Sequence, residues 1–309
     1  MDCIITAVYR VEPYKREGLE NAFTRNFDAE NYVTGVRSLL GLDKDVYVFC
    51  NEEPVQFKGR LVHVEDIFKE TLLNKYNIDK LHFIPIKLEN IFTRYNSLWQ
   101  KCIDIANKNP NNLYCWNPPV CLARIDMMKY IFDNFDQYKN VCWVDAGLSN
   151  DSYIPKNRGG TMHDYELQNW NNYYPDNQSD MFNPKLGNRI FQLINDNGNF
   201  TVGQTSINQE PFNFIHEKLP DKQITRSYSN VGCVLGFSKK YLDTLLDEFN
   251  SALDLFIDEY NYAFTEIEVL SYLNYIKDFK KLLWSNCLPE EGNVISLNYA
   301  LDQKIFTDI

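Results

Sequence analysis

The chain has 309 residues, a formal net charge of −11 at pH 7, 44% hydrophobic residues and 15% aromatic residues. This composition is that of a globular protein with a sizeable core, and it excludes an intrinsically disordered chain. The acidic balance argues against a nucleic-acid-binding protein, because such proteins need a basic face. Recognition of an anionic ligand would therefore depend on a few well-placed Arg, Lys or metal charges.

The cysteine pattern and the apolar runs predict an intracellular protein. Eight cysteines occur without a CxxC pair, so neither a zinc site nor a disulfide framework is predicted. The apolar N-terminal stretch is too short for a signal peptide and is interrupted by Arg10. No window approaches the roughly 18 apolar residues of a membrane span. We expect a cytoplasmic location, with peripheral membrane contact left open.

The first third of the chain alternates short apolar runs with helix-spaced segments. Strands are predicted at Cys3–Val8, Val46–Cys50 and Arg60–Val64, and helices at Asn31–Gly41 and Ile67–Lys75. Strand, helix, strand, helix at these spacings predicts an α/β fold with a parallel sheet covered by helices.

The middle of the chain contains the clearest internal strand. Helices are predicted at Phe92–Ala106 and Val120–Phe135, the second beginning at Pro118-Pro119 because proline is tolerated in a first turn. Val141–Val144 follows as a buried strand. The segment Ser149–Phe182 is rich in Asn, Asp, Tyr and Gly, and a loop of this length is usually functional or mobile.

The last third is predicted to continue the same domain. A short helix is expected at Gly187–Asn195, a strand at Asn230–Phe237, and helices at Lys240–Tyr260 and Thr265–Tyr275. No internal repeat or low-complexity linker divides the chain, so one domain is predicted.

Asp145 is the first candidate for chemistry, because it directly follows the apolar strand Val141–Val144. In open α/β sheets, ligands bind beyond the carboxyl ends of the strands. An Asp there can meet a metal ion or a sugar hydroxyl, and Ala146 and Gly147 leave space for a ligand near the backbone. The alternative is an ordinary turn in which Asp145 bonds its own backbone. Position alone leaves both interpretations open.

The helix before this strand carries Arg124, Asp126 and Lys129 among apolar residues. Arg124 has the forked donor geometry that can hold a diphosphate. The alternative is that these charges form a solvated helix face, and their spacing alone favours that alternative.

Polar residues also follow the first two predicted strands. Tyr9 and Arg10 come after the first strand, and Asn51 comes after the second. The carboxyl ends of parallel strands share one edge, so these residues suit recognition of the base and phosphate of a nucleotide.

Two further candidates lie in the second half. Glu266 could act as a base or stabilise developing positive charge, whereas Glu268 is assigned mainly to a capping box with Thr265. His163 is a candidate ligand contact, because it lies beside Arg158-Gly159-Gly160. No Gly-rich phosphate loop and no HExxH zinc pattern occurs.

Three segments resemble the HtrL/YibB family: the opening ITAVYRV, the helix ARIDMMKYIFDNF and the strand VCWVDAGLSN. The most specific part runs from Pro118 to Asn150. The resemblance implies a GT-A-like glycosyltransferase fold, a Rossmann-related, mostly parallel sheet flanked by helices. Residues 1–309 would form one domain, with a nucleotide-binding half at 1–150 and an acceptor-side half at 151–309.

The resemblance also implies site residues. Arg124 and Asp126 match the helix that precedes the family's acidic motif, and Asp145 matches the first acid of its metal-binding D-x-D. The segment TEIEVLSYL, which includes Glu266, resembles the acidic helix start on the acceptor side. Gly147 stands where a second carboxylate would lie, so the implied Mn²⁺ or Mg²⁺ would depend on Asp145, with Asn150 or Asp151 as a compensating ligand. The alternative is a weakly bound or absent metal, with Arg and Lys neutralising the diphosphate.

The function expected from these features is transfer of a sugar from a nucleotide-sugar donor, a UDP-sugar, to a glycan or lipid-linked acceptor. Tyr9, Arg10 and Asn51 would hold the nucleoside, and Asp145 would address the diphosphate or donor sugar. One alternative is a non-catalytic nucleotide- or glycan-binding protein. A phosphohydrolase with Asp145 as nucleophile is less favoured, because no second acid lies two residues on.

Overall fold

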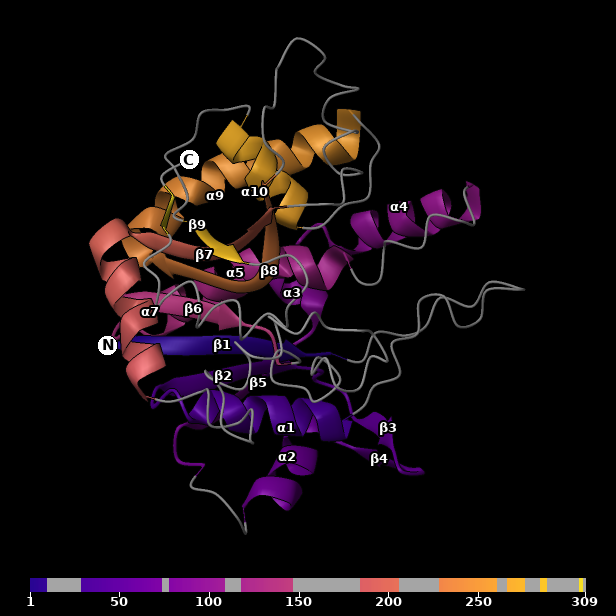
Figure 1. Ribbon diagram of the computed structural model, residues 1–309. Helices are drawn as coiled ribbons and strands as arrows, with labels where there is room; N and C mark the ends of the chain where they lie inside the picture. The colour runs from indigo at the N-terminus through magenta and orange to yellow at the C-terminus, as the bar shows by residue number, and fades with distance from the viewer. Residues whose placement is uncertain are drawn as a thin grey trace, which may run out of the picture.

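The computed structural model describes nine stretches of the chain. They are residues 1–9, 29–73, 78–108, 118–146, 184–205, 228–259, 266–275, 284–287 and 306–307. The predicted long loop at 149–182 lies outside these described residues. The strands and helices of the described part pack as layers around one sheet (Figure 1).

The described strands form an eight-stranded main sheet and a small two-stranded one. Across the main sheet the strands are β10 (Phe306–Thr307), β9 (Trp284–Cys287), β7 (Asn199–Thr205), β8 (Tyr228–Ser238), β6 (Asn140–Val144), β1 (Asp2–Val8), β2 (Asp45–Cys50) and β5 (Leu81–Pro85). Strands β6, β1, β2 and β5 run parallel, whereas β8 is antiparallel to both β6 and β7. The predicted α/β class with a mostly parallel, Rossmann-like sheet is confirmed.

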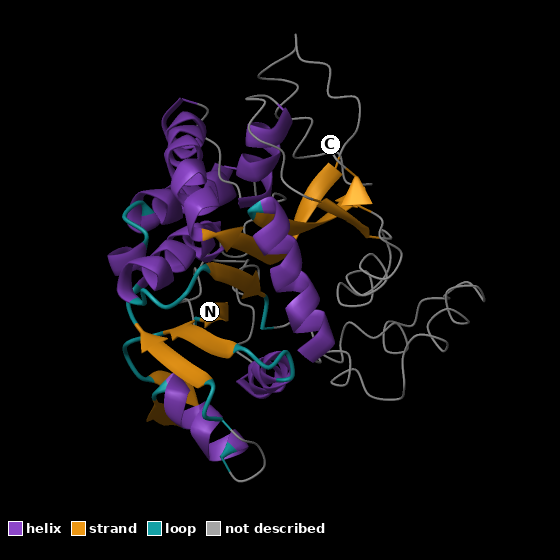
Figure 2. Ribbon diagram, turned by 90° about the vertical axis from the view of Figure 1, so that its left-hand side faces the viewer, coloured by secondary structure: helices purple, strands orange, loops and turns teal. Residues whose placement is uncertain are grey.

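Helices cover both faces of this sheet (Figure 2). One face packs against α1 (Ala29–Leu40), α2 (Val64–Leu72) and α7 (Pro184–Asn197). The other packs against α3 (Leu88–Ile91), α4 (Tyr95–Lys108), α5 (Pro118–Asn134), α9 (Lys239–Asp254) and α10 (Glu266–Tyr275). Strand β1 contributes to the hydrophobic cores on both faces, because successive side chains of a strand point to opposite faces. Ile4 and Val8 belong to the first core, between the sheet and α1, α2 and α7, whereas Cys3 and Ile5 belong to the second core, on the opposite face.

Helix α5 is the centre of the second core. It begins at Pro118, as predicted, and most of its apolar side chains are buried. The buried residues are Leu122, Ala123, Ile125, Met127, Met128, Ile131 and Phe132. These side chains face several directions, because α5 lies between the sheet and helices α4, α9 and α10. A charged residue on the packed sides of α5 therefore has little access to solvent and needs a partner, whereas Lys129 and Asp133 lie on an exposed side of the helix.

The predicted strand at Arg60–Val64 is not part of the main sheet. Residues Arg60–Val62 form β4, which pairs antiparallel with β3 (Val55–Phe57) in the two-stranded sheet. Lys58 and Gly59 between them both have positive φ, 47° and 81°, as a tight hairpin turn requires. The parallel strand next to β2 is instead β5, which was not predicted.

Gly198 explains a second difference. The helix predicted at Gly187–Asn195 extends over Pro184–Asn197 as α7, and the following β7 was not predicted. Gly198 has φ 81° and its amide donates to the Ile194 carbonyl at 2.7 Å. This left-handed glycine ends α7 and turns the chain into β7.

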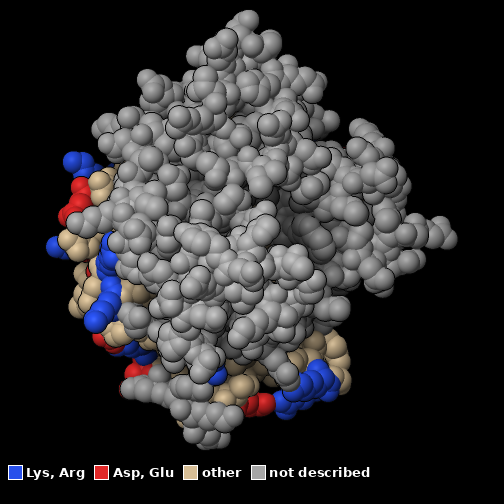
Figure 3. All heavy atoms as spheres, viewed as in Figure 1, with Lys and Arg blue, Asp and Glu red and all other residues tan. Residues whose placement is uncertain are grey.

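Charges of both signs lie side by side on the described part of the face in Figure 3. Exposed ion pairs of the described residues include Arg60–Glu70 (2.6 Å) and Lys80–Asp43 (2.5 Å). Pairs of this kind contribute little to stability. Within the described stretches, no helix has both the length and the hydropathy that crossing a bilayer would require.

Candidate functional site

The chain reverses its direction across the sheet between β1 and β6. From β1 it adds β2 and then β5 on one side, and it returns through α3, α4 and α5 to place β6 on the other side of β1. The carboxyl ends of β1 and β6 therefore lie side by side at the point where the order of the strands reverses. Such a switch point is where open α/β sheets bind ligands.

Tyr9 and Asp145 are the residues that follow these two strands. Ile5 pairs with Trp143, so Asp145 lies level with Ala7 of the neighbouring strand. Tyr9 packs against the core on the α5 face, and Asp145 contacts Arg124 of α5. From strand spacing and rise, the two Cα atoms are about 8 Å apart. The structure therefore brings together two predicted site residues that are far apart in sequence.

Asp145 is held by two donors on one oxygen. Trp143 Nε1 donates to its Oδ1 at 2.8 Å, and Arg124 Nη2 donates to the same atom at 3.0 Å. The side chain is 34% exposed, and among the described residues no donor reaches Oδ2. These two contacts, one from a neighbour in sequence and one from α5, fix the carboxylate in place, and they leave Oδ2 to accept a hydrogen bond or to coordinate a cation.

Arg124 does not lie on a solvated helix face, and the interpretation favoured from its spacing is wrong. Its side chain is only 11% exposed and its guanidinium lies over the Trp143 ring, 4.8 Å from the ring centroid. It bridges Asp145 and Glu266. Since α5 is packed on most sides, its arginine has to be paired, because an unpaired buried charge is strongly destabilising.

Glu266 is the first residue of α10, and its side chain is completely buried. It accepts a hydrogen bond from Arg124 Nη1. Glutamate in a first helical turn is also favoured by the helix dipole. The contact makes Glu266 a positioning residue for Arg124, and its proposed catalytic role stays a prediction. The formal charges of Arg124, Asp145 and Glu266 sum to −1.

Asp126 does not join this cluster. Two positions along a helix correspond to about 200° of rotation, so Asp126 projects away from Arg124. Burial raises the pKa of Asp126 to about 7, while the charges of Arg94 and Lys129 act in the opposite direction. Lys129 itself pairs with Asp133 at 2.5 Å. Arg124 and Asp126, which are neighbours in the sequence motif, therefore lie in two separate environments on α5.

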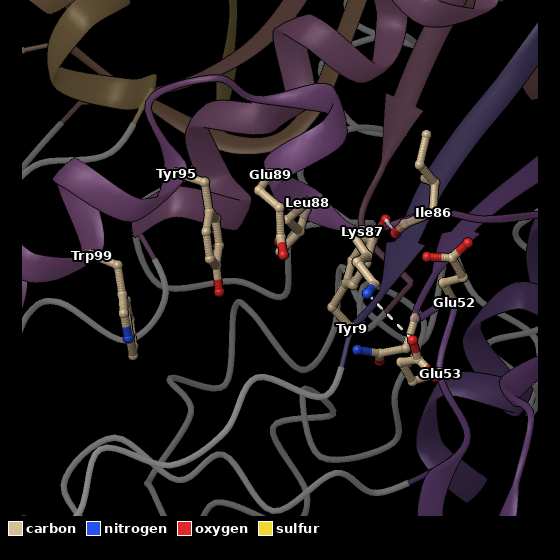
Figure 4. A pocket seen from close by; sticks show the side chains of 10 residues that line it. Tyr9, Glu52, Glu53, Ile86, Lys87, Leu88, Glu89, Tyr95 and Trp99 are labelled. Carbon is tan, nitrogen blue, oxygen red and sulfur yellow. Dashed lines mark hydrogen bonds and ion pairs between the residues drawn. The ribbon is translucent and has the colours of Figure 1, made fainter.

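A cavity of about 270 Å³ lies at the carboxyl ends of β1, β2 and β5 (Figure 4). Its lining combines aromatic, apolar and charged side chains: Tyr9, Asn51, Glu52, Glu53, Ile86, Lys87, Leu88, Glu89, Tyr95 and Trp99. Tyr9 Oη donates to the Ile86 carbonyl at 2.8 Å and so joins the ends of β1 and β5. The predicted pair Tyr9 and Asn51 thus lines one cavity.

The helical side of this cavity was not predicted from the sequence. Tyr95 and Trp99 are four residues apart on α4, which puts both on one helix face. That spacing was visible in the sequence. What was missing was β5, because without it nothing indicated that α4 follows the edge where Tyr9 and Asn51 lie.

The cavity has a net negative lining. Lys87 Nζ lies 3.3 Å from Glu53 Oε1, so that pair is neutral. Burial raises the pKa of Tyr9 and of Tyr95, and the nearby Glu89 charge adds to both shifts. Both phenols are therefore neutral at physiological pH, and they present aromatic faces beside a carboxylate.

Gly35 allows α1 to pack directly against the residue after Asp145. A Cβ atom at Gly35 would lie 1.4 Å from the Ala146 carbonyl oxygen, which is impossible without movement. The backbone that carries Asp145 is thus supported from the α1 face and by Arg124 from the α5 face. A glycine inside a predicted helix was the sequence signal for this close approach.

The described residues offer limited ligands for a metal ion. No group of three or more His, Cys, Asp or Glu residues gathers within the described ranges. Asp145 Oδ2 can supply one oxygen, which fits Mg²⁺ held mainly by phosphate and water. Arg124 beside the same carboxylate opposes tight binding of a bare cation. The predicted site residues Arg10, Gly147 and His163 lie outside the described residues.

Comparison of the whole chain with protein-family models gives no match, and comparison with curated proteins gives none either. The functional conclusion therefore has to come from the site itself.

Proposed function

We propose that this protein is a GT-A-like glycosyltransferase that moves a sugar from a nucleotide-sugar donor to a glycan or lipid-linked acceptor. One observation carries the proposal. An aromatic-lined cavity and a fixed, partly exposed carboxylate lie at the same edge of the sheet, on either side of its switch point. A nucleotide-sugar has two parts that suit these two features. Its planar base can stack on aromatic side chains, and the hydroxyl groups of its sugar can donate hydrogen bonds to a carboxylate.

The nucleoside would occupy the cavity. Tyr9, Tyr95 and Trp99 provide aromatic surface for a base, and Asn51 provides an amide. The carboxylates of the lining disfavour a phosphate group inside the cavity. The diphosphate would therefore extend from the cavity toward the β1 and β6 ends, and the donor sugar would reach Asp145.

The reaction breaks the bond between the anomeric carbon of the sugar and the diphosphate oxygen. A hydroxyl oxygen of the acceptor forms the new bond to that carbon, and the hydroxyl proton leaves to a base or to solvent. Asp145 Oδ2 would accept a hydrogen bond from a donor hydroxyl and so orient the sugar. A bound Mn²⁺ or Mg²⁺ would neutralise the departing diphosphate, with Asp145 as its protein ligand.

A non-catalytic nucleotide- or glycan-binding protein is the second candidate. The observation in its favour is the pairing of Asp145 with Arg124, which occupies one of the two carboxylate oxygens of Asp145 in a structural contact. Turnover separates the two candidates. Release of free nucleoside diphosphate from a donor that the protein binds supports the transferase, and binding without any release over hours supports the binding protein.

Calorimetric titration with UDP, GDP and CMP tests the proposal. Each nucleotide is titrated with Mn²⁺ and with EDTA, into the wild type and into Asp145→Ala. Asp133→Ala is the matched control, because Asp133 is an exposed carboxylate at the far end of α5. We expect one nucleotide to bind selectively. With Mn²⁺ present, Asp145→Ala should weaken that binding and Asp133→Ala should not, because the metal at the diphosphate would depend on Asp145. If a folded wild type binds none of the three under either condition, the proposal is wrong.

A further inference from the structure

The charges of the cavity bear on which base the donor carries. Three glutamates and one lysine line it, and Lys87 pairs with Glu53. Glu52 and Glu89 remain as negative charges. Carboxylates only accept hydrogen bonds when ionised. A base is therefore favoured in this cavity if the edge that faces a carboxylate presents N–H donors, and disfavoured if that edge presents carbonyl oxygens.

Glu89 is the carboxylate best placed to accept hydrogen bonds from a nucleotide base in the cavity. Figure 4 shows its side chain between those of Tyr95 and Tyr9, with Glu52 at the far side of Lys87. The Glu89 charge also acts on the pKa of both tyrosines, as expected for a carboxylate between two rings. Among the described residues Glu89 makes no ion pair or hydrogen bond.

The common bases differ in the donors they offer to one carboxylate. Guanine presents two adjacent donors, N1–H and the N2 amino group, which match the two oxygens of a carboxylate. Uracil presents a single N3–H between two carbonyl oxygens, and both carbonyls would face negative charge. Two parallel charge-assisted hydrogen bonds are strong and geometrically selective. An aromatic face adds stacking for any base, so stacking does not decide between them.

We infer that the cavity selects a guanine nucleotide, held by Glu89 at N1–H and N2–H and stacked against Tyr9, Tyr95 or Trp99. The inference rests on the proposed function, and it replaces the uracil nucleotide expected from the sequence by a GDP-sugar as the donor class.

Titration with GDP, UDP and inosine diphosphate tests it on the full chain. Inosine diphosphate differs from GDP only by the missing N2 amino group. We expect GDP to bind about tenfold or more tighter than UDP and inosine diphosphate, as loss of a charge-assisted bond predicts. Glu89→Gln should reduce this preference to about threefold or less, because the charge is lost while the shape is kept.

Two matched variants make the result specific. Glu52→Gln removes another carboxylate of the same cavity, and Glu248→Gln changes an exposed glutamate on α9. Both should keep the preference for GDP. An equal loss in Glu52→Gln would overturn the Glu89 contact, because overall charge would then select the base. Circular dichroism establishes that each variant is folded.

The outcomes also separate this inference from the function on which it rests. If UDP binds as tightly as GDP or more tightly, the guanine assignment is wrong while nucleotide binding stands. Equal binding of GDP and inosine diphosphate overturns the contact to the N2 amino group. If none of the three nucleotides binds a folded wild type, the proposed function fails and the inference fails with it.

Discussion

Arg124 of α5 donates a hydrogen bond to Glu266, the first residue of α10, across 142 residues of sequence. The same guanidinium reaches Asp145 beyond the end of β6. This one side chain therefore joins the central helix, the switch-point edge of the sheet and the start of a late helix. The carboxylate of the proposed site is fixed by a bridge that forms only when both halves of the chain are packed.

Replacing Glu266 should destabilise the fold strongly. Glu266→Ala leaves Arg124 without its buried partner, and breaking such a pair by removing one member costs about 3–5 kcal/mol. Urea denaturation measures the change in the free energy of unfolding. The control is Glu248→Ala on the exposed side of α9, which we expect to stay within about 0.5 kcal/mol of the wild type. Equal stability of the two variants would mean that the buried bridge contributes nothing.

Gly35→Ala should also be destabilising, for a steric reason. The added Cβ would meet the Ala146 carbonyl at 1.4 Å, so α1 has to move away from the sheet edge. Overpacking of this kind costs about 1–3 kcal/mol, occasionally more. Gly59→Ala is the control, because a Cβ there meets nothing within 4 Å and only the positive φ opposes it. Thermal unfolding should show a larger loss for Gly35→Ala, and the reverse order would refute the close contact.

Asp126 should make stability depend on pH. Its pKa is raised from 3.8 to about 7 by burial, so the folded state binds a proton more tightly than the unfolded state. Its contribution is therefore fully present below about pH 4 and is lost as the pH rises toward 7. At 1.36 kcal/mol per unit, the loss across this window is about 4 kcal/mol.

The variant Asp126→Asn tests this dependence. It should be more stable than the wild type at pH 8, and its unfolding free energy should change less between pH 4 and 7. Asp133→Asn on the same helix is the control, because Asp133 is half-exposed and pairs with Lys129. Denaturant titrations at several pH values give the curves. A wild-type curve parallel to that of Asp126→Asn would contradict the assignment.

The hydroxyl of Tyr9 should make a small, measurable contribution to the free energy of unfolding. Tyr9→Phe removes its bond to the Ile86 carbonyl, and an ordinary hydrogen bond of this kind contributes about 1 kcal/mol. Tyr95→Phe is a close control within the same cavity, because the Tyr95 hydroxyl makes no hydrogen bond with the described residues. Chemical denaturation should distinguish the two. A neutral Tyr9→Phe would show that the bond does not hold the ends of β1 and β5 together.

Several elements were predictable because their signals are local. The run Cys3–Val8 and the run Val141–Val144 are short and apolar, and both became central parallel strands. The apolar residues of α5 have helical spacing. Asp145 could be placed at the end of a strand from its sequence neighbours alone. The pairing of strands was not predictable in the same way. The residues Val55–Val62 form a separate hairpin, because a strand-like run in the sequence does not specify which strand it pairs with.

The sequence by itself determined the α/β class, the central strands and the edge at which polar residues gather, because periodicity and chain order act within a few residues. Only the tertiary structure decided that Arg124 is buried, that it clamps Asp145 and Glu266, and that Asp126 faces elsewhere. It also decided that α4 completes the cavity around Tyr9. The physical reason is that burial and ion pairing depend on residues up to 142 positions apart. A pattern within a few residues of sequence does not show which distant residues come into contact.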